Sequence, residues 1–236
     1  MNSLRVMAAL LTYPSKELQG AADELKAALK SETFVGPKTL SGLNQLIDYV
    51  AETDLMELEE SYVLFFDRTR SLSLNLFEHV YGDSRNRGEA MVELQKTYDA
   101  HGLMLDSGEL PDFLPAFLEF LSMLAPEAAR EELGRPLHVI TVLAERLEKR
   151  KSPYAIVLRA LEEFAAARPN QKELAVLQGQ IDDDPDDFEA IDKIWNESPV
   201  EFGSGGSCSK LSDVLSALEA EQIGKGNLAE IKEKRS

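Results

Sequence analysis

The chain has 236 residues, 44% of them hydrophobic, so it is long enough and apolar enough to bury a sizeable core. Asp and Glu outnumber Lys and Arg by 42 to 25, and the formal charge of −17 argues against nucleic-acid binding, which depends on clustered basic side chains. The single cysteine, Cys208, excludes an intramolecular disulfide and any metal site built from several cysteines of this chain.

The N-terminal residues carry a short apolar stripe at helical spacing. They lack the long uninterrupted apolar run and the small-residue cleavage site of a signal peptide. No stretch of the sequence approaches the roughly 18 apolar residues of a membrane-spanning helix. We therefore expect a soluble, cytoplasmic protein.

Helical periodicity continues through the first hundred residues. Ser15 can cap a helix, and Gly36-Pro37 separates that helix from the next. Asp54, with Glu57 three residues later, resembles a capping box. Gly102 can end a later helix. The expected apolar stripes run over 18–29, 43–50, 55–66 and 91–98.

The pattern remains helical in the second half. Leu110-Pro111-Asp112 is expected to open a helix that Pro126 closes, and Ser152-Pro153 is a start signal with proline at the first helical position. The apolar stripes run over 114–121, 137–147 and 154–161. Because no alternating runs flank an Asn-Gly or Asp-Gly turn, we predict an all-α fold, a compact single-domain helical bundle.

The C-terminal part has a different composition. IDDDPDDFEAIDKIW is acidic, with Phe188, Ile191 and Trp195 at helical spacing, and GSGGSCSK is typical of a flexible linker. We therefore assign residues 1–202 to the helical domain. Residues 203–236 are expected to form a linker and a partly ordered or disordered tail, with one more apolar stripe over 211–223.

Motifs that carry chemistry are scarce. None of the three histidines follows a glutamate at the spacing that di-iron bundles use. No glycine-rich phosphate loop follows a strand, and no serine lies in a nucleophile-elbow pattern. The sequence therefore predicts neither a metal site nor a bound cofactor, and it does not favour an enzyme.

Residues 72–91, LSLNLFEHVYGDSRNRGEAM, combine an alternating apolar run, a Glu-His pair, a turn and two arginines. Glu78 and His79 could form an acid–base pair, or they could cap a helix and hold a loop. The alternation of Leu72, Leu74 and Leu76 fits an extended or tightly wound segment with one side buried. The nearby phenylalanines, Phe65, Phe66 and Phe77, suit either a core or a ligand contact.

Four arginines lie close together in this otherwise acidic chain: Arg68, Arg70, Arg85 and Arg87. We expect some of them to neutralise neighbouring carboxylates, namely Asp67, Glu78 and Asp83, and so to fix the geometry of the loop. The residues expected to structure this turn and the one around Pro111 are Asp83, Arg85, Arg87, Gly88, Pro111 and Asp112.

The stretch YVLFFDRTRSLSLNLFEHVYGDSRNRGEAM resembles the signature region of the NarJ family of nitrate reductase assembly chaperones, part of the wider TorD/DmsD group. LLTYPS, YDAHGL, ELPDFLPAFLEFL and SPYAIVL also look like this family, in the same order. The resemblance covers about residues 1–200. One departure is Phe113, where the family usually has histidine, so a polar role of that histidine does not carry over.

The resemblance implies an all-helical protein that is not an enzyme. It implies binding of the N-terminal segment of a nitrate reductase catalytic subunit until the molybdenum cofactor and an iron–sulfur cluster are inserted, before membrane attachment. It also allows contact with molybdenum cofactor biosynthesis proteins. The residues expected to hold the client peptide are Phe65, Leu72, Leu74, Leu76, Phe77, Glu78, His79, Phe117 and Phe120. The alternative is a nucleotide-dependent or small-molecule enzyme or switch that uses Glu78, His79 and Asp112.

Overall fold

The computed structural model describes residues 1–32, 34–82, 85–105, 108–180 and 182, and these residues belong to one compact unit. Within these ranges every regular element is a helix and there is no strand, which confirms the predicted all-α fold. The segment around Phe188, the stripe over 211–223 and the tail from 203 onward lie outside the described residues.

The first half of the chain forms short helices whose starts follow the sequence signals. Ser15 Oγ accepts a 3.2 Å hydrogen bond from Leu18 N–H, and Asp54 accepts one of 3.0 Å from Met56 N–H. The single helix expected after Ser15 is two helices, because the chain turns at Gly20-Ala21, where glycine disfavours helix. The helices are α1 (Asn2–Leu10), α2 (Lys16–Gly20), α3 (Ala22–Ser31), α4 (Pro37–Glu52) and α5 (Leu55–Tyr62).

The end of α5 widens into a π-helical turn, η1 (Val63–Asp67), in which Arg68 N–H reaches back to the Val63 carbonyl. Such turns are rare and are frequent at functional sites. The chain then forms the 3₁₀ turn η2 (Arg70–Leu72), α6 (Leu76–Tyr81) and the long α7 (Arg85–Ala100). Gly102, with φ of +77°, follows α7 and ends it as expected.

The second half contains the helices that the apolar stripes predict, with shifted starts. The helix expected from Leu110-Pro111-Asp112 begins only at Leu114, because Asp112 is used in contacts with residues 76 and 77. Likewise, the helix signalled by Ser152-Pro153 begins at Ala155. The helices are α8 (Leu114–Met123), α9 (Pro126–Gly134), α10 (Leu137–Lys149), α11 (Ala155–Ala165) and α12 (Gln171–Gln178).

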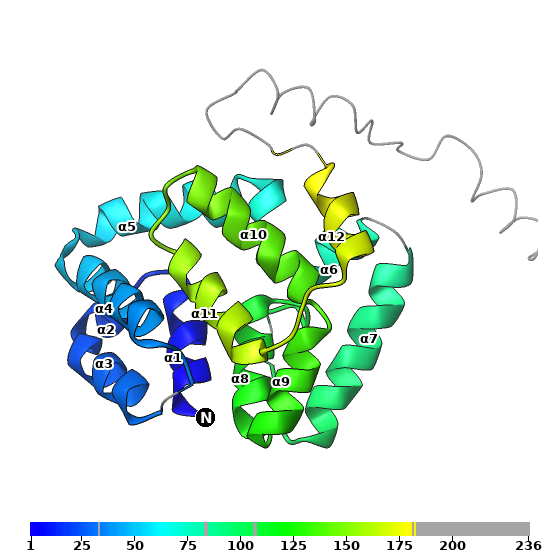
Figure 1. Cartoon of the computed structure of the whole chain (residues 1–236), viewed down its shortest axis with the longest axis horizontal. Coiled ribbons are helices and arrows are strands. Elements are labelled where there is room, and N and C mark those ends of the chain that lie inside the picture. Colours follow the sequence, from blue (N-terminus) through cyan, green and yellow to red (C-terminus); the bar gives the residue numbers. More distant parts are fainter. Residues whose placement is uncertain (33, 83–84, 106–107, 181, 183–236) are drawn as a thin grey trace, which may run out of the picture. The chain divides into compact units, whose positions relative to one another are not determined.

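Helix α10 lies at the centre of the packing, between α11 and α12, and nearly all of its side chains are buried (Figure 1). Helix α1 packs on α8 and α3, and α4 packs on α11. In contrast, α7 lies at the edge, and among its described side chains only Tyr98 is fully buried.

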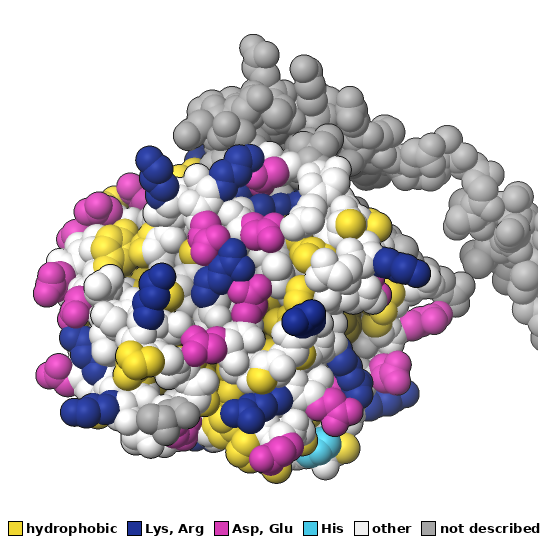
Figure 2. All heavy atoms as spheres, in the orientation of Figure 1, with side chains coloured by type: hydrophobic (Ala, Val, Ile, Leu, Met, Phe, Trp, Pro, Cys, Tyr) yellow, Lys and Arg dark blue, Asp and Glu magenta, His cyan; other side chains and the backbone are white. Residues whose placement is uncertain are grey.

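The described surface mixes charge and apolar groups. Figure 2 shows Lys and Arg interspersed with Asp and Glu on one face, with apolar patches between them. The acidic excess therefore does not form a single acidic field on that face. Among the described helices, none is both long enough and apolar enough to cross a bilayer.

Candidate functional site

Two of the motif stretches meet in space. The residues between η2 and α6 run antiparallel to the residues before α8, with Asn75 opposite Phe113. Leu76 N–H donates to the Asp112 carbonyl and Leu114 N–H donates to the Leu74 carbonyl, each over 2.9 Å. The leucine alternation fits an extended or a tightly wound segment, and the structure has a 3₁₀ turn up to Leu72 and then an extended segment that backbone bonds fix to residues nearly forty positions later.

Asp112 is fully buried and joins three segments. Its Oδ2 accepts a 3.1 Å hydrogen bond from Phe77 N–H at the start of α6. Arg87, from α7, places one guanidinium nitrogen 3.6 Å from the same oxygen and the other 3.2 Å from Glu78 Oε1. Burial raises the pKa of Asp112, while the Phe77 N–H and Arg87 act in the opposite direction. Arg87 thus pairs with Glu78, one of the carboxylates expected for it.

His79 has a separate contact. Its Nε2 lies 2.8 Å from the Ser73 carbonyl oxygen, to which it donates as the neutral tautomer. Burial lowers the pKa of His79, and the nearby Arg146 lowers it further. Glu78 faces Arg87 and His79 faces the backbone, so the two side chains hold different parts of the structure.

Arg146 was not among the residues predicted from the sequence, but its guanidinium joins two distant segments. From α10, it donates to the Ser71 carbonyl (2.7 Å) and to the Leu177 carbonyl at the end of α12 (3.1 Å). Asp182 lies beside it and pairs with Lys149 at 2.9 Å and Arg150 at 2.7 Å. An arginine between the apolar positions of a buried helix was the available sequence signal.

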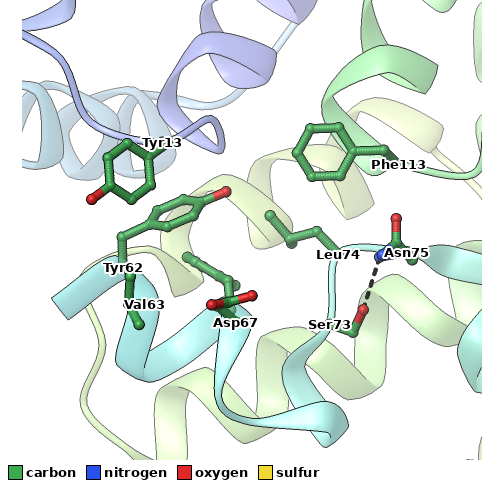
Figure 3. A pocket seen from close by; sticks show the side chains of 9 residues that line it. Tyr13, Tyr62, Val63, Asp67, Ser73, Leu74, Asn75 and Phe113 are labelled. Atoms are coloured by element: carbon green, nitrogen blue, oxygen red, sulfur yellow. Dashed lines mark hydrogen bonds between the residues drawn. The ribbon is translucent and has the colours of Figure 1, made fainter. Parts of the chain in front are cut away.

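An aromatic hollow of about 330 Å³ opens on one side of the extended segment. Figure 3 shows Tyr13 and Tyr62 on one side and Phe113 on the other, with Leu74 between them and the Asp67 carboxylate below the Tyr62 ring. We call this site the aromatic hollow; its residues are Tyr13, Tyr62, Val63, Phe66, Asp67, Ser73, Leu74, Asn75 and Phe113.

A second hollow of about 330 Å³, the α6 groove, lies beside the start of α6. Its apolar lining comes from α6, α7, α8 and α10 and includes two exposed side chains, Val80 and Tyr81. Charged groups of α9 and α12 lie at its border. The lining residues are Leu76, Phe77, Val80, Tyr81, Leu94, Phe117, Glu132, Arg135, Pro136, His138, Val139 and Glu173.

The predicted client-binding residues do not all lie in one hollow. Leu76, Phe77 and Phe117 line the α6 groove, and Leu74 lines the aromatic hollow. Leu72 and Phe120 are buried and Phe65 is half-buried, and none of these three lines either hollow. Their contact with a client stays a prediction.

The predicted turn residues are placed as follows. Pro111 accepts a 2.9 Å hydrogen bond from the Tyr98 hydroxyl at its carbonyl, which ties the end of α7 to the same turn. Gly88 lies in the first turns of α7, with open space beside its Cα. Arg85 begins α7. Asp83 lies outside the described residues, so its predicted role in the turn stays a prediction.

The family described as "Nitrate reductase delta subunit" matches residues 13–160, a span that contains the aromatic hollow and all of the α6 groove except Glu173. The chain belongs to this family. Residues 13–160 are the matched family region, and the resemblance seen in the sequence is confirmed.

Three curated relatives of the nitrate reductase delta subunit family are similar over most of their length. The nitrate reductase molybdenum cofactor assembly chaperone NarJ of Escherichia coli K12 is 34% identical over 210 residues, 88% of each chain. The probable chaperone NarW of the same strain is 32% identical over 202 residues, 86% of this chain and 84% of NarW. The probable chaperone NarJ of Bacillus subtilis 168 is 32% identical over 157 residues, 66% of this chain and 83% of that protein.

Proposed function

We propose that this chain is a dedicated assembly chaperone of a nitrate reductase and not an enzyme. It binds the N-terminal segment of the catalytic subunit in the cytoplasm. It holds that subunit while the molybdenum cofactor and an iron–sulfur cluster are inserted, before the enzyme attaches to the membrane. Both inserted groups are cargo of the client. The names of the three relatives support the assembly role.

The observation that carries the binding function is the α6 groove. Val80 and Tyr81 expose apolar surface at its border, and Phe77 and Phe117 lie deeper. An amphipathic client helix can insert apolar side chains into such a groove between helices. The groove is framed by buried contacts of Asp112, so its shape does not have to form anew when the client arrives.

The expected affinity is moderate. Burying three aliphatic client side chains would yield about 5–9 kcal/mol, at about 1.5–3 kcal/mol each. Ordering a flexible peptide costs about 2–5 kcal/mol, and association itself has a further cost. The balance suits a chaperone, because the client must be released once it is complete.

The contacts of Glu78, His79 and Asp112 support binding over the alternative of a catalytic or nucleotide-dependent site. Glu78 pairs with Arg87, His79 bonds to Ser73, and Asp112 caps α6. Each of these groups has an internal role that a substrate would have to displace. Titration of the client-free protein with nucleotides is expected to give no binding.

The test is calorimetry with the N-terminal peptide of the catalytic subunit from the same organism. Val80 is 49% exposed, so Val80→Asp places a charge in the groove without disturbing the core. We expect at least about tenfold weaker binding, because a carboxylate must lose its water against apolar client side chains. Met56→Asp is the matched control, since Met56 is 67% exposed and lines neither hollow. Wild-type protein that gives no heat with the peptide would refute the chaperone function.

A further inference from the structure

The aromatic hollow differs in chemistry from the α6 groove. Its lining includes the rings of Tyr13, Tyr62, Phe66 and Phe113 and also the carboxylate of Asp67. The rings of Tyr13 and Tyr62 pack edge to face with their centroids 5.5 Å apart, and this contact fixes one wall of the hollow. Rings arranged around a space with a nearby anion are the usual recognition element for an organic cation.

Asp67 is an exposed carboxylate at the end of the π-helical turn, and it has no ion-pair partner among the described residues. Asp67 lines the hollow, and its charge adds to the raised pKa of the Tyr62 hydroxyl, behind burial and the neighbouring Tyr154. That hydroxyl itself donates to the Leu11 carbonyl at 2.9 Å and is not available to neutralise Asp67. Asp67 is therefore available to pair with a cation that enters the hollow.

The size of the hollow limits its occupant. Its volume of about 330 Å³ is at the lower end of the range for small-molecule sites, roughly 300–1,000 Å³. It suits the end of one long side chain and is too small for a folded helix. The extended segment leads from the hollow directly into α6, since Leu74 lines the hollow and Leu76, the first residue of α6, lines the α6 groove.

We propose that the aromatic hollow binds one Lys or Arg side chain of the client segment, with the rings of Tyr13 and Phe113 against the cation and Asp67 as its counter-charge. The source of the side chain rests on the proposed chaperone function. The client then contributes apolar side chains to the α6 groove and one cation to the aromatic hollow. The charge of −17 on the chain favours the encounter with such a basic segment.

The first test is a double-mutant cycle by calorimetry between Asp67→Asn and a peptide in which one Lys or Arg at a time becomes norleucine. We expect Asp67→Asn and one of the peptide changes each to weaken binding about tenfold, and the pair together to weaken it no further. The Asp67→Asn variant should also lose most of the difference in affinity between about 0.1 M and about 1 M salt. Glu60→Gln removes an exposed carboxylate from the same helical run outside both hollows and serves as the control.

Tyr13 tests the ring independently of the charge. Tyr13 is 51% exposed, so Tyr13→Leu should fold normally and weaken binding, while Tyr13→Phe keeps the ring and should weaken it less. An N-acetylated peptide shows whether the occupant is the client's α-amino group. If acetylation alone reproduces the loss, the side-chain assignment is wrong.

The two proposals fail in different ways. If the peptide binds but every cycle with Asp67→Asn is additive within about twofold, the cation pocket is refuted and the chaperone function stands. If the peptide does not bind at all, N-acetylarginine amide is titrated while the Tyr13 ring signals are followed by NMR. Shifts that Asp67→Asn abolishes would keep the pocket without the chaperone function, and no shifts would refute both.

Discussion

Arg146 on α10 donates a 2.7 Å hydrogen bond to the carbonyl oxygen of Ser71, 75 residues earlier in the chain. The same guanidinium donates to Leu177 at the end of α12, so one buried side chain fixes the start of the extended segment and the last described helix to the central helix. The extended segment lines the aromatic hollow and leads into α6, which lines the α6 groove. Arg146 therefore helps to position the segment beside the two proposed binding sites and lines neither of them.

Arg146→Met should destabilise the protein by about 3–5 kcal/mol, because two buried carbonyls lose their donor and the methionine supplies none. Urea unfolding followed by circular dichroism measures this loss. Arg159→Met is the matched control on α11, where the guanidinium pairs with Glu148 and Glu162 at the surface, and it should cost at most about 1 kcal/mol. Equal losses in the two variants would show that Arg146 does not act through its buried bonds.

Asp112→Ala should cost about 2–4 kcal/mol, since α6 loses its cap and Arg87 loses a buried partner. Asp54→Ala removes the exposed cap of α5 and should cost only about 1 kcal/mol. Hydrogen exchange at the Phe77 amide, which donates to the Asp112 side chain, should increase in the first variant and not in the second. Unchanged protection at this amide in Asp112→Ala would contradict the capping role.

The helices were more predictable than the site. The stripe over 137–147 identifies α10 because each turn places an apolar side chain on one face. The alternation of Leu72, Leu74 and Leu76 predicts one buried side. Ser71 and Ser73 on the other side are buried as well, because α10 contacts η2 and residues 112–114 pair with the segment. Such enclosure depends on partners far along the chain.

The aromatic hollow shows the same limit. Its walls come from the loop after α1, the end of α5, η1, the extended segment and Phe113, and no local pattern brings these together. The quoted motifs LLTYPS and ELPDFLPAFLEFL contain Tyr13 and Phe113, so the sequence shows both residues but not that they line one hollow. The helix start expected at Leu110-Pro111-Asp112 was wrong for a related reason, since Asp112 serves a distant helix.

The pH dependence of stability should report on His79. Burial lowers the pKa of His79 in the folded state below its unfolded value of about 6.5, so the unfolded chain binds a proton first as the pH falls. Stability from this residue is therefore fully present above about pH 6.5 and is lost as the pH falls through that value towards the folded pKa. His79→Gln should flatten the decline in urea midpoint below pH 6.5, whereas His101→Gln, at an exposed position, should keep the wild-type profile. If the urea midpoint depends on pH in the same way in all three proteins, His79 does not cause the loss of stability at low pH.

Two helical glycines should respond to alanine with opposite signs. At Gly42 in α4, an added Cβ would lie 2.7 Å from Ile156 Cγ1 and 2.8 Å from its Cδ1, so Gly42→Ala should destabilise the α4–α11 packing by about 1–3 kcal/mol. At Gly88 in α7, an added Cβ meets nothing within 4 Å, and Gly88→Ala should stabilise the protein by about 0.5–1 kcal/mol. Urea unfolding of both variants measures the two signs.

The double variant Gly42→Ala with Ile156→Ala identifies the cause of the first loss. Because Ile156→Ala removes both atoms that the new methyl would strike, the double variant should be more stable than the sum of the single losses predicts. If the losses add, α4 does not depend on this close approach. If Gly88→Ala instead destabilises the protein, Gly88 has the turn-structuring role that the sequence predicts, and the start of α7 requires a conformation that alanine does not tolerate.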